Sequence, residues 1–338
     1  MRKILVLPPP KLRADLFDPP VADRLNALGE IIANPNDRNY TSEELADLIP
    51  GMEAVVTSWG SPKLTDEVLA KADSLKVIVH AAGSVKGLLT PAVFEKGIAV
   101  CTSQPAMGIS VAAMTVAMME IMLRNVVNLA SAIRSQRTWR PELGGRGFTE
   151  PPSRELSGKV VGIVGASLIG RLVIQFIQPW DVELRIFDPY LSAEEAESFG
   201  AKKVSLEEIF AECDVISIHA PLTDETRGMI TREHLKSIKP GAVLINTSRG
   251  AIIDHVALLD ELKTGRFSAA LDVTDPEPLP NGHEFFGLEN VVFTPHISGG
   301  TPEMKLRQGE AAVRNLELFL TGGTPNRLVT EDMLDTMA

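Results

Sequence analysis

The chain of 338 residues is poor in several residue types, and each shortage excludes a class of protein. Its two cysteines, Cys101 and Cys213, lie in apolar runs without metal-ligand spacing, so we expect two buried reduced thiols, no disulfide scaffold and no metal site. Basic runs are absent, and 44 Asp and Glu against 33 Lys and Arg give a net charge of −11. Nucleic-acid and anionic-membrane partners are therefore not expected, because both need clustered Lys or Arg.

Long hydrophobic segments are also lacking. The first apolar run has only five residues before the three prolines that begin at Pro8, which is too short for a signal peptide. The longest uncharged stretch, 97–119, is interrupted at Pro105 and Gly108 among others, so no membrane span is expected. With 44% hydrophobic and 23% charged residues, the composition is that of a soluble globular protein, and a cytoplasmic location is the expectation.

Short apolar runs alternate with amphipathic segments, a pattern typical of βαβ units and parallel sheets. At about 150 residues per domain, the length indicates two domains. Strands are predicted at 3–7, 31–33, 54–57, 77–80 and 98–102, then at 160–164, 184–187, 215–219, 243–247, 269–273 and 291–294, with a weaker one at 203–204. If the amphipathic helix predicted at 303–320 returns to the first series, the first domain is discontinuous.

The two series are joined by segments of a different kind. We predict one long helix over 109–133, with four methionines (Met107, Met114, Met118 and Met122) near one face, as a core or subunit contact. A loop rich in Gly, Pro and Arg follows at 134–157. Near the N-terminus, Thr41 and Glu44 form a T-x-x-E pattern that predicts a capped helix start.

The strand predicted at 160–164 runs into a glycine-punctuated turn, Gly165-Ala-Ser-Leu-Ile-Gly170, and then into a helix. This G-x-S-x-x-G differs from the dinucleotide fingerprint G-x-G-x-x-G, whose glycines permit a tight turn, a close approach to pyrophosphate and helix–strand packing. The pyrophosphate then lies at the helix N-terminus, which favours an anion. Ser167 stands at the second glycine position, where its Cβ would crowd the phosphate while its hydroxyl could donate to it; the sequence leaves both effects open.

Asp188 ends the next predicted strand, eighteen residues after Gly170. An acid there can accept both ribose hydroxyls of NAD and repels the 2′-phosphate of NADP. The alternative is an Asp that caps the turn before Pro189. A hydrolase is a weaker alternative, because Gly165-Ala-Ser167 resembles the start of a nucleophile elbow, but the fifth position is Ile169 and not Gly.

Three further polar segments follow predicted strands, where open α/β sheets bind ligands. The first carries Arg249, which can bind a carboxylate through two bonds or be a solvated loop charge. The second runs from Asp272 to Glu277. The third carries His296, which can donate a proton beside an acid or be structural.

Together these segments resemble the D-isomer-specific 2-hydroxyacid dehydrogenase family, which includes phosphoglycerate, glyoxylate and hydroxypyruvate reducers. The resemblance rests on motifs in order over more than 130 residues: Glu155-Leu-Ser-Gly-Lys-Val-Val-Gly-Ile-Val-Gly, His219-Ala-Pro-Leu-Thr-Asp-Glu-Thr-Arg-Gly, Lys239-Pro-Gly-Ala-Val-Leu-Ile-Asn-Thr-Ser-Arg-Gly, Leu271-Asp-Val and Pro295-His. It implies an α/β fold of two doubly wound domains. A flavodoxin-like substrate domain would comprise 1–107 and 299–338, and a Rossmann NAD-binding domain would comprise 108–298.

The resemblance also implies a site. Its Arg, Glu and His triad falls on Arg249, Glu277 and His296, with Arg249 binding and polarising a 2-oxo acid and His296, kept protonated by Glu277, delivering the proton as hydride reaches C2. NAD contacts are implied at Gly165, Ser167, Leu168, Ile169, Gly170, Asp188, His219, Ala220, Pro221, Thr226, Thr247, Ser248, Arg249, Asp272, His296 and Gly299. Substrate contacts are implied at Trp59, Ala82, Gly83, Ser84, Arg249 and His296.

The chain departs from the family pattern in ways that bear on the substrate. The carboxylate-binding turn continues as Ser84-Val-Lys where the family usually has Gly-Val-Asp, and His255 replaces a common Glu. The loop at Trp59 lacks the Arg of phosphoglycerate-type enzymes, which favours a small, non-phosphorylated 2-oxo acid and its D-2-hydroxy acid. Family resemblance implies a homodimer. The alternative is an NAD(H)-binding redox sensor, similar to the family's corepressors, with little turnover.

Overall fold

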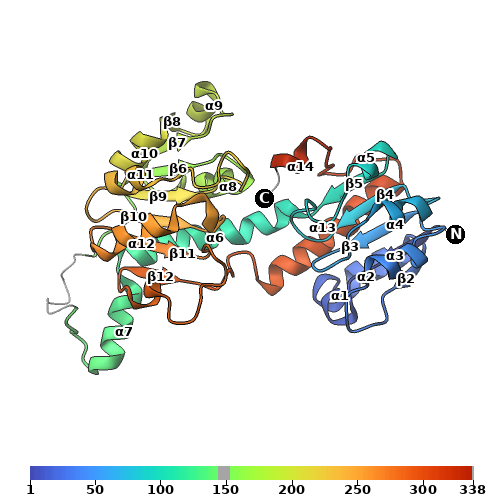
Figure 1. Cartoon of the computed structure of the whole chain (residues 1–338), viewed down its shortest axis with the longest axis horizontal. Coiled ribbons are helices and arrows are strands. Elements are labelled where there is room, and N and C mark those ends of the chain that lie inside the picture. Colours follow the sequence, from blue (N-terminus) through green and yellow to red (C-terminus); the bar gives the residue numbers. More distant parts are fainter. Residues whose placement is uncertain (144–152, 337–338) are drawn as a thin grey trace. The chain divides into compact units, whose positions relative to one another are not determined.

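The computed structural model describes residues 1–143 and 153–336. The chain divides into two compact units, one of Met1–Gly108 with Gly299–Ala338 and one of Ile109–Ser298. Unit 1 is therefore built from both ends of the chain, and unit 2 is inserted between them (Figure 1). The expected division lay at 107/108 and 298/299, so its first boundary falls one residue earlier than the observed one.

Unit 1 contains a parallel sheet of five strands in the order β2-β1-β3-β4-β5, which is the flavodoxin-like order. The predicted fold class is confirmed for this unit. Its strands are β1 (Lys3–Val6), β2 (Glu30–Ala33), β3 (Ala54–Thr57), β4 (Val77–His80) and β5 (Ala99–Thr102). Its helices are α1 (Pro10–Leu16), α2 (Pro19–Ala27), α3 (Ser42–Leu48), α4 (Asp66–Lys71), α5 (Ala92–Glu95), α13 (Pro302–Leu320) and α14 (Met333–Thr336).

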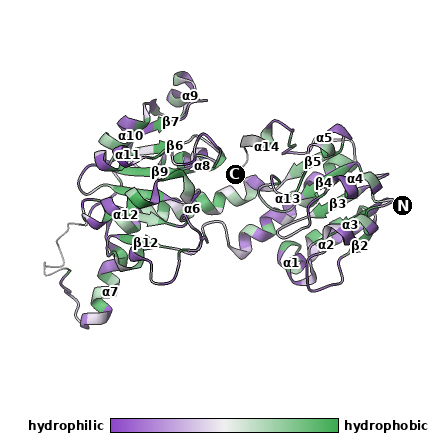
Figure 2. Cartoon of the chain, viewed as in Figure 1, coloured by the Kyte–Doolittle hydropathy of each residue, from purple (hydrophilic) through white to green (hydrophobic). Residues whose placement is uncertain are grey.

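Side chains alternate between the two faces of this sheet, and each face has its own core. Leu5, Val55 and Ile78 pack with residues of α3, α4 and α5. Ile4, Val56 and their face-mates pack with residues of α1, α2 and α13. Figure 2 shows the strands mainly in hydrophobic colours and the outer helices with hydrophilic faces. The capping box predicted at the start of α3 is confirmed by its two reciprocal hydrogen bonds, one between Glu44 N and Thr41 Oγ1 and one between Thr41 N and Glu44 Oε2.

Helix α13 completes unit 1 across about 280 residues of sequence. A Cβ added to Gly309 would lie 1.7 Å from the carbonyl oxygen of Leu16, so only glycine lets α13 approach α1 this closely. Arg24 of α2 binds Glu310 and Glu317 of α13, each at 2.6 Å. The return of the predicted 303–320 helix to the first strand series makes this unit discontinuous.

Unit 2 contains a parallel sheet of seven strands in the order β12-β11-β10-β9-β6-β7-β8, and its first six strands in sequence follow the Rossmann order. The strands are β6 (Val160–Val164), β7 (Glu183–Phe187), β8 (Ala201–Lys203), β9 (Val215–Ile218), β10 (Val243–Asn246), β11 (Ser268–Leu271) and β12 (Val291–Phe293). The weak strand expected at 203–204 corresponds to β8. The helices of this part of the chain are α6 (Gln104–Leu123), α7 (Val126–Gln136), α8 (Leu168–Ile177), α9 (Ala193–Ser198), α10 (Leu206–Glu212), α11 (Arg232–Ser237), α12 (His255–Lys263), η1 (Gly250–Ile252) and η2 (Glu284–Gly287).

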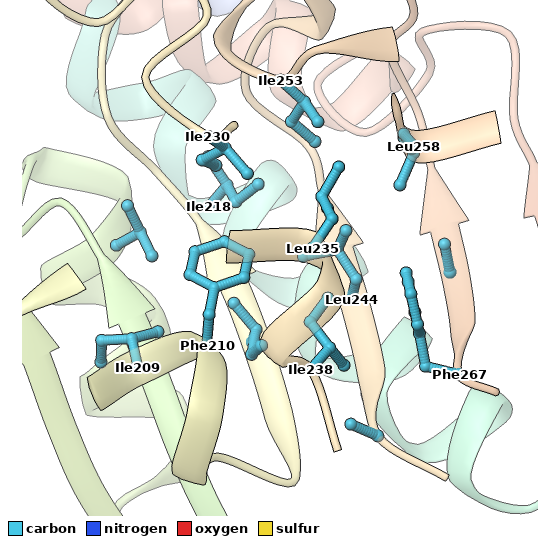
Figure 3. Packing of buried hydrophobic residues seen from close by; sticks show 14 of the residues in the cluster. Ile209, Phe210, Ile218, Ile230, Leu235, Ile238, Leu244, Ile253, Leu258 and Phe267 are labelled. Carbon is cyan, nitrogen blue, oxygen red and sulfur yellow. The ribbon is translucent and has the colours of Figure 1, made fainter. Parts of the chain in front are cut away.

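Helices cover both faces of the second sheet. Residues of α6, α8 and α9 pack on one face, and residues of α10, α11 and α12 pack on the other. Figure 3 shows the second of these cores, in which Phe210, Leu235 and Leu244 lie together. The buried free thiols are confirmed: Cys101 and Cys213 are both inaccessible, and burial raises the pKa of each thiol to about 12.

The single long helix predicted over 109–133 is wrong. The helix breaks after Leu123, because Asn125 adopts a left-handed conformation with φ of 53°. Asn tolerates this conformation better than most residues, and its side-chain oxygen accepts a bond from the side chain of Asn128. The backbone amide of Arg154, from beyond the helices, donates to the freed carbonyl of Leu123. The rest of the predicted 134–157 loop includes residues 144–152, which lie outside the described residues.

Helix α6 also begins earlier than expected. Pro105 lies in its first turn, where proline is tolerated because the amide hydrogen has no helical partner there. By length and composition α6 could cross a membrane, but the core helix of a soluble protein meets the same criterion. Its residues Met118, Met119 and Leu123 are buried in the core of unit 2.

Candidate active site

The carboxyl ends of neighbouring strands β10, β11 and β12 carry the three residues predicted as catalytic. Arg249 follows β10, Glu277 lies in the connection after β11, and His296 follows β12. In a parallel sheet these ends share one edge, which is where open α/β sheets bind ligands. The structure therefore brings the three segments to the same edge of unit 2.

His296 and Glu277 form a direct pair. The imidazole Nδ1 lies 2.5 Å from Oε1 of Glu277, and the two side chains keep 47% and 38% of their surface exposed. A carboxylate at Nδ1 selects the tautomer and orients the ring, so that Nε2 is the nitrogen left for a reacting group. This is the arrangement expected of a general acid or base.

Arg249 is held by its own turn. Its Nη1 donates to the carbonyl of Ser248 at 2.8 Å, and the buried side chain of Asn246 donates to the carbonyl of Arg249 at 3.0 Å. The next residue, Gly250, packs directly against the backbone of Thr274, and an added Cβ would lie 2.1 Å from it. The Arg249 turn is thus fixed against the connection that carries Glu277, and most of the five guanidinium donors stay available for a ligand.

The turn between β6 and α8 has the close contacts that the dinucleotide fingerprint requires. Gly165 has φ of 95°, and a Cβ there would lie 2.6 Å from the amide nitrogen of Ala220. A Cβ at Gly170 would lie 2.2 Å from the carbonyl oxygen of Gly165. The turn then presents the first amides of α8, which have no partner within the helix. These features fit the pyrophosphate of a dinucleotide at the N-terminus of α8.

The hydrogen bonds of Ser167 show what its hydroxyl does within the protein. Its hydroxyl donates to the carbonyl of His219 at 2.8 Å and accepts from the amide of Gly170 at 3.4 Å, so Ser167 is the N-cap of α8. The hydroxyl proton of Ser167 is therefore donated to the carbonyl of His219, in the loop that follows β9. With φ of −63°, the backbone does not need glycine at this position.

We predict that Ser167→Ala lowers the free energy of unfolding of unit 2 by about 1 kcal/mol, as loss of an N-cap does. The affinity for NADH should stay close to wild type, because the lost donor bonds His219 and not a phosphate. Chemical denaturation and NADH fluorescence titration measure the two quantities. Unchanged stability combined with weakened NADH binding would show instead that the hydroxyl contacts the pyrophosphate.

Asp188 caps the turn before Pro189, and contact with the ribose of NAD stays a prediction. One carboxylate oxygen accepts from the amide of Tyr190 at 2.8 Å, which caps the turn, and the other accepts from the amide of Ala166 at 2.7 Å. The carboxylate is thereby held against the phosphate-binding turn. Each oxygen retains a lone pair, so acceptance of the ribose hydroxyls stays compatible with this geometry.

The other residues predicted to contact NAD in unit 2 surround the same edge. His219 is buried, its Nε2 lies 2.8 Å from Ser217 Oγ, and burial lowers its pKa to about 3. Ser248 donates to the carbonyl of Ala220, and Thr226 donates to the carbonyl of Pro221, both at 2.6 Å. Thr247 is also buried and shares a hydrogen bond with Thr115. Asp272 is buried, with 4% of its surface exposed, and its carboxylate accepts hydrogen bonds from residues of the loop after β12.

The residues predicted to contact substrate in unit 1 follow β3 and β4. Trp59 is 37% exposed in the loop after β3, whereas Ala82 and Gly83 are buried in the turn after β4. The hydroxyl of Ser84 accepts from the amide of Lys86 at 3.3 Å, so the departure at Ser84 supplies a local cap. Substrate contact at these residues stays a prediction.

Comparison with known proteins decides the family. Residues 116–298, more than half of the chain, match the model of the "D-isomer specific 2-hydroxyacid dehydrogenase, NAD binding domain". The chain belongs to the D-isomer-specific 2-hydroxyacid dehydrogenase family. Unit 2 is the NAD-binding domain of this family, which confirms the predicted Rossmann fold and cofactor.

Relatives of this chain include proteins named glyoxylate reductase and proteins named D-3-phosphoglycerate dehydrogenase. Glyoxylate reductase of Thermococcus litoralis is 33% identical over 86% of this chain and 87% of its own length. D-3-Phosphoglycerate dehydrogenase of Methanocaldococcus jannaschii is 32% identical over 92% of this chain, but the chain spans only 58% of that protein. A solved structure of a protein from Thermus thermophilus is similar with a TM-score of 0.74 and 32% identity, covering 97% of this chain and 100% of that one.

Several residues that shape the site of this family member were missed by sequence reasoning. Asn246 bonds both Ser248 and Arg249, and Thr294 and Ser298 bond Asp272. Asn246 lies at a strand end inside a quoted motif, and an Asx residue there often bonds the backbone two residues on. Thr294 and Ser298 carry no such local signal, because their partner lies more than 20 residues away in the sequence.

Proposed function

We propose that the protein is an NAD-dependent oxidoreductase that interconverts a small, non-phosphorylated 2-oxo acid and its D-2-hydroxy acid. The observation that carries this proposal is the His296–Glu277 pair at 2.5 Å, on the sheet edge that also presents Arg249 and the Gly165 turn. A proton donor, a carboxylate-binding cation and a dinucleotide turn in one unit are what this chemistry requires.

The proposed roles follow from the chemistry of each side chain. Arg249 binds the substrate carboxylate through two parallel hydrogen bonds and polarises the neighbouring carbonyl. His296 delivers a proton from Nε2 to the carbonyl oxygen as it gains negative charge, and Glu277 stabilises the imidazolium throughout. Bound NADH supplies the hydride. In the reverse direction His296 accepts the hydroxyl proton.

The choice of NAD over NADP rests on Asp188. Its carboxylate is held by two backbone amides at the end of β7, where the adenosine ribose of a dinucleotide is bound in this fold. A fixed negative charge there accepts the ribose hydroxyls and repels a 2′-phosphate. The nearby cation Arg171 is paired with Glu195 at 2.7 Å, so it is not free to neutralise that phosphate.

The choice of a non-phosphorylated substrate rests on the loops of unit 1. The loop after β3 presents Trp59. The hydroxyl of Ser58, in the same loop, is bonded within the protein, because it donates to the carbonyl of Ala81. Arg38 lies after β2 but is bound to Glu44. Arg13 donates to the carbonyls of Pro8 and Asn34. Arg13 and Arg38 are therefore committed to partners within the protein, and the loop after β3 offers the ring of Trp59 to a substrate side chain.

Self-association is part of the proposal. Helix α7 projects from unit 2 (Figure 1) and leaves Val126, Val127 and Ile133 exposed at 44%, 43% and 37%. An exposed apolar helix face is typical of a subunit contact. A homodimer that covers this face is the assembly we propose.

The test is a substrate panel. The protein is mixed with NADH or NADPH and with one acid at a time, and absorbance at 340 nm is followed. The acids are glyoxylate, hydroxypyruvate, pyruvate, phenylpyruvate and 3-phosphohydroxypyruvate. We expect turnover of at least one non-phosphorylated acid with a preference for NADH, in a sample whose light-scattering mass is twice that of the monomer. Tight NADH binding without turnover of any acid would favour the redox-sensor alternative.

A further inference from the structure

The backbone of His296 is held in a conformation that the residue would not choose by itself. Its φ is 54°, in the left-handed region, which is unfavourable for a residue other than glycine. His296 is also half-exposed, and so packing around its side chain does not impose the conformation. Another part of the molecule must hold the 294–298 loop in place.

The side chain of Asp272, at the end of β11, is surrounded by this loop. Oδ1 accepts from Thr294 Oγ1 at 2.5 Å and from the amide of Ile297 at 2.9 Å. Oδ2 accepts from the amide and the hydroxyl of Ser298, at 2.9 and 2.5 Å. A carboxylate accepts about four hydrogen bonds, so this one is saturated.

The main chain of Asp272 adds two further contacts. Its carbonyl accepts from the amide of His296 itself at 3.0 Å, and its amide donates to the carbonyl of Asn246 at the end of β10. The main chain of Asp272 is therefore anchored to the sheet through Asn246. Its side chain bonds Thr294, which precedes His296, and Ile297 and Ser298, which follow it. The four carboxylate bonds go to loop residues, whereas the imidazole is paired with Glu277.

We infer that Asp272 is a positioning residue for the proposed reaction: it holds His296 in its left-handed conformation, so that the ring meets Glu277 and turns Nε2 outward. The inference rests on the function proposed above and deepens it. It goes beyond the cofactor contact that the sequence suggested for Asp272, because all four donors to its carboxylate come from the loop that carries His296.

The decisive variant is Asp272→Asn, which keeps the shape but replaces an acceptor by a donor that faces backbone amides. We expect kcat to fall about 100-fold, as displacement of a catalytic group by about 1 Å can cause. The KM for the 2-oxo acid and the Kd for NADH should change little, because Arg249 and the Gly165 turn are untouched. Hydrogen exchange at the amides of Ile297 and Ser298 should accelerate.

A matched control lies away from the site. Asp181 is exposed just before β7, at the opposite end of the strands, so Asp181→Asn makes the same chemical change and should leave kcat and exchange as in wild type. A second pair of variants removes and restores a single donor. Ser298→Ala should lower kcat in the same direction as Asp272→Asn, and Ser298→Thr, which keeps the hydroxyl, should restore most of it.

The outcomes separate the inference from the proposed function. A large rise in the Kd for NADH with normal turnover at saturation would make Asp272 a cofactor contact and overturn the positioning role. Unchanged exchange at Ile297 and Ser298 in Asp272→Asn would overturn it as well, even in a protein that turns over no acid. Failure of the wild-type protein on the whole panel, with accelerated exchange in the variant, would reject the function and keep Asp272 as the anchor of the loop.

Discussion

His296→Gln is expected to lower kcat by about 10²–10⁴-fold, the range that general acid–base catalysis contributes. Glutamine keeps a polar side chain of similar length but cannot give up a proton at neutral pH, so the alkoxide formed at the substrate oxygen is left without its donor. NADH should bind as in wild type, because the phosphate turn at Gly165 and Asp188 lies after other strands. Steady-state kinetics on the best acid of the panel, with NADH titration by fluorescence, measure both quantities.

A matched histidine tests whether this loss is specific. His234→Gln makes the same change at a residue whose ring packs on Phe210 in the core of unit 2 and bonds Thr231 at the start of α11. Glutamine is a normal residue at that capping position, so kcat should be retained. Comparable kcat values in His296→Gln and the wild-type protein would remove His296 from the mechanism.

The second large effect is on stability between pH 7.5 and 5.5. Burial lowers the pKa of His80 to about 4 and that of His219 to about 3, and it also lowers the pKa of His255. In the unfolded chain these groups titrate near 6.5. A histidine whose pKa is lower in the native state contributes stability above pH 6.5, and this contribution is lost as the pH falls.

The size of this effect follows from proton linkage. Between pH 7.5 and 5.5 the unfolded state takes up nearly one proton per histidine that the native state refuses, which costs about 1.4 kcal/mol for each. With His219, unit 2 should lose about 1.4 kcal/mol, to which the lowered pKa of His255 adds in the same direction, and unit 1, with His80, should also lose about 1.4 kcal/mol. Urea denaturation at the two pH values measures the losses, followed by circular dichroism for both units and, for unit 1, by the fluorescence of Trp59 in a protein with Trp139→Phe and Trp180→Phe.

Substitution distinguishes the part of the pH dependence that comes from the buried histidines from the part that comes from carboxylates. His219→Asn cannot take up a proton, so the pH dependence of unit 2 should shrink by about 1.4 kcal/mol whatever the variant does to absolute stability. His283 is half-buried, and His283→Asn serves as the matched substitution, which should leave the pH dependence of unit 2 larger than His219→Asn leaves it. Equal stability of the wild-type protein at pH 7.5 and 5.5 would show that the buried rings are not held neutral.

The sheets could be predicted from the sequence because buried parallel strands are continuous apolar runs whose ends are visible in the residues themselves. The strands 54–57, 77–80 and 160–164 were predicted to the residue. The break at Asn125 could not be predicted, since the amide of Arg154, about 30 residues further along, bonds the carbonyl of Leu123, and the amide of Leu156 bonds the side chain of Glu120. Helical periodicity carries no information about such partners.

The site shows the same division between local and distant causes. The positions of Gly165 and Gly170 followed from a motif whose steric reasons are local to the turn. The role of the Ser167 hydroxyl did not, because its acceptor is a carbonyl 52 residues later. Asp272 was predicted as a cofactor contact from its motif, whereas its bonds to residues 294–298 are visible only once β11 and β12 are paired.

The split of unit 1 across both ends of the chain bears on the order in which the protein folds during synthesis. All strands of unit 2 are complete once residue 293 has been made, whereas one face of the unit 1 sheet awaits Ala312, Val313 and Leu316 of α13. On the ribosome, where domains generally fold as units, the second unit in the sequence can thus reach its native state first. Until α13 emerges, the side chains of β4 and β5 that it covers remain open to water, and this nascent stage is where a chaperone would have most to bind.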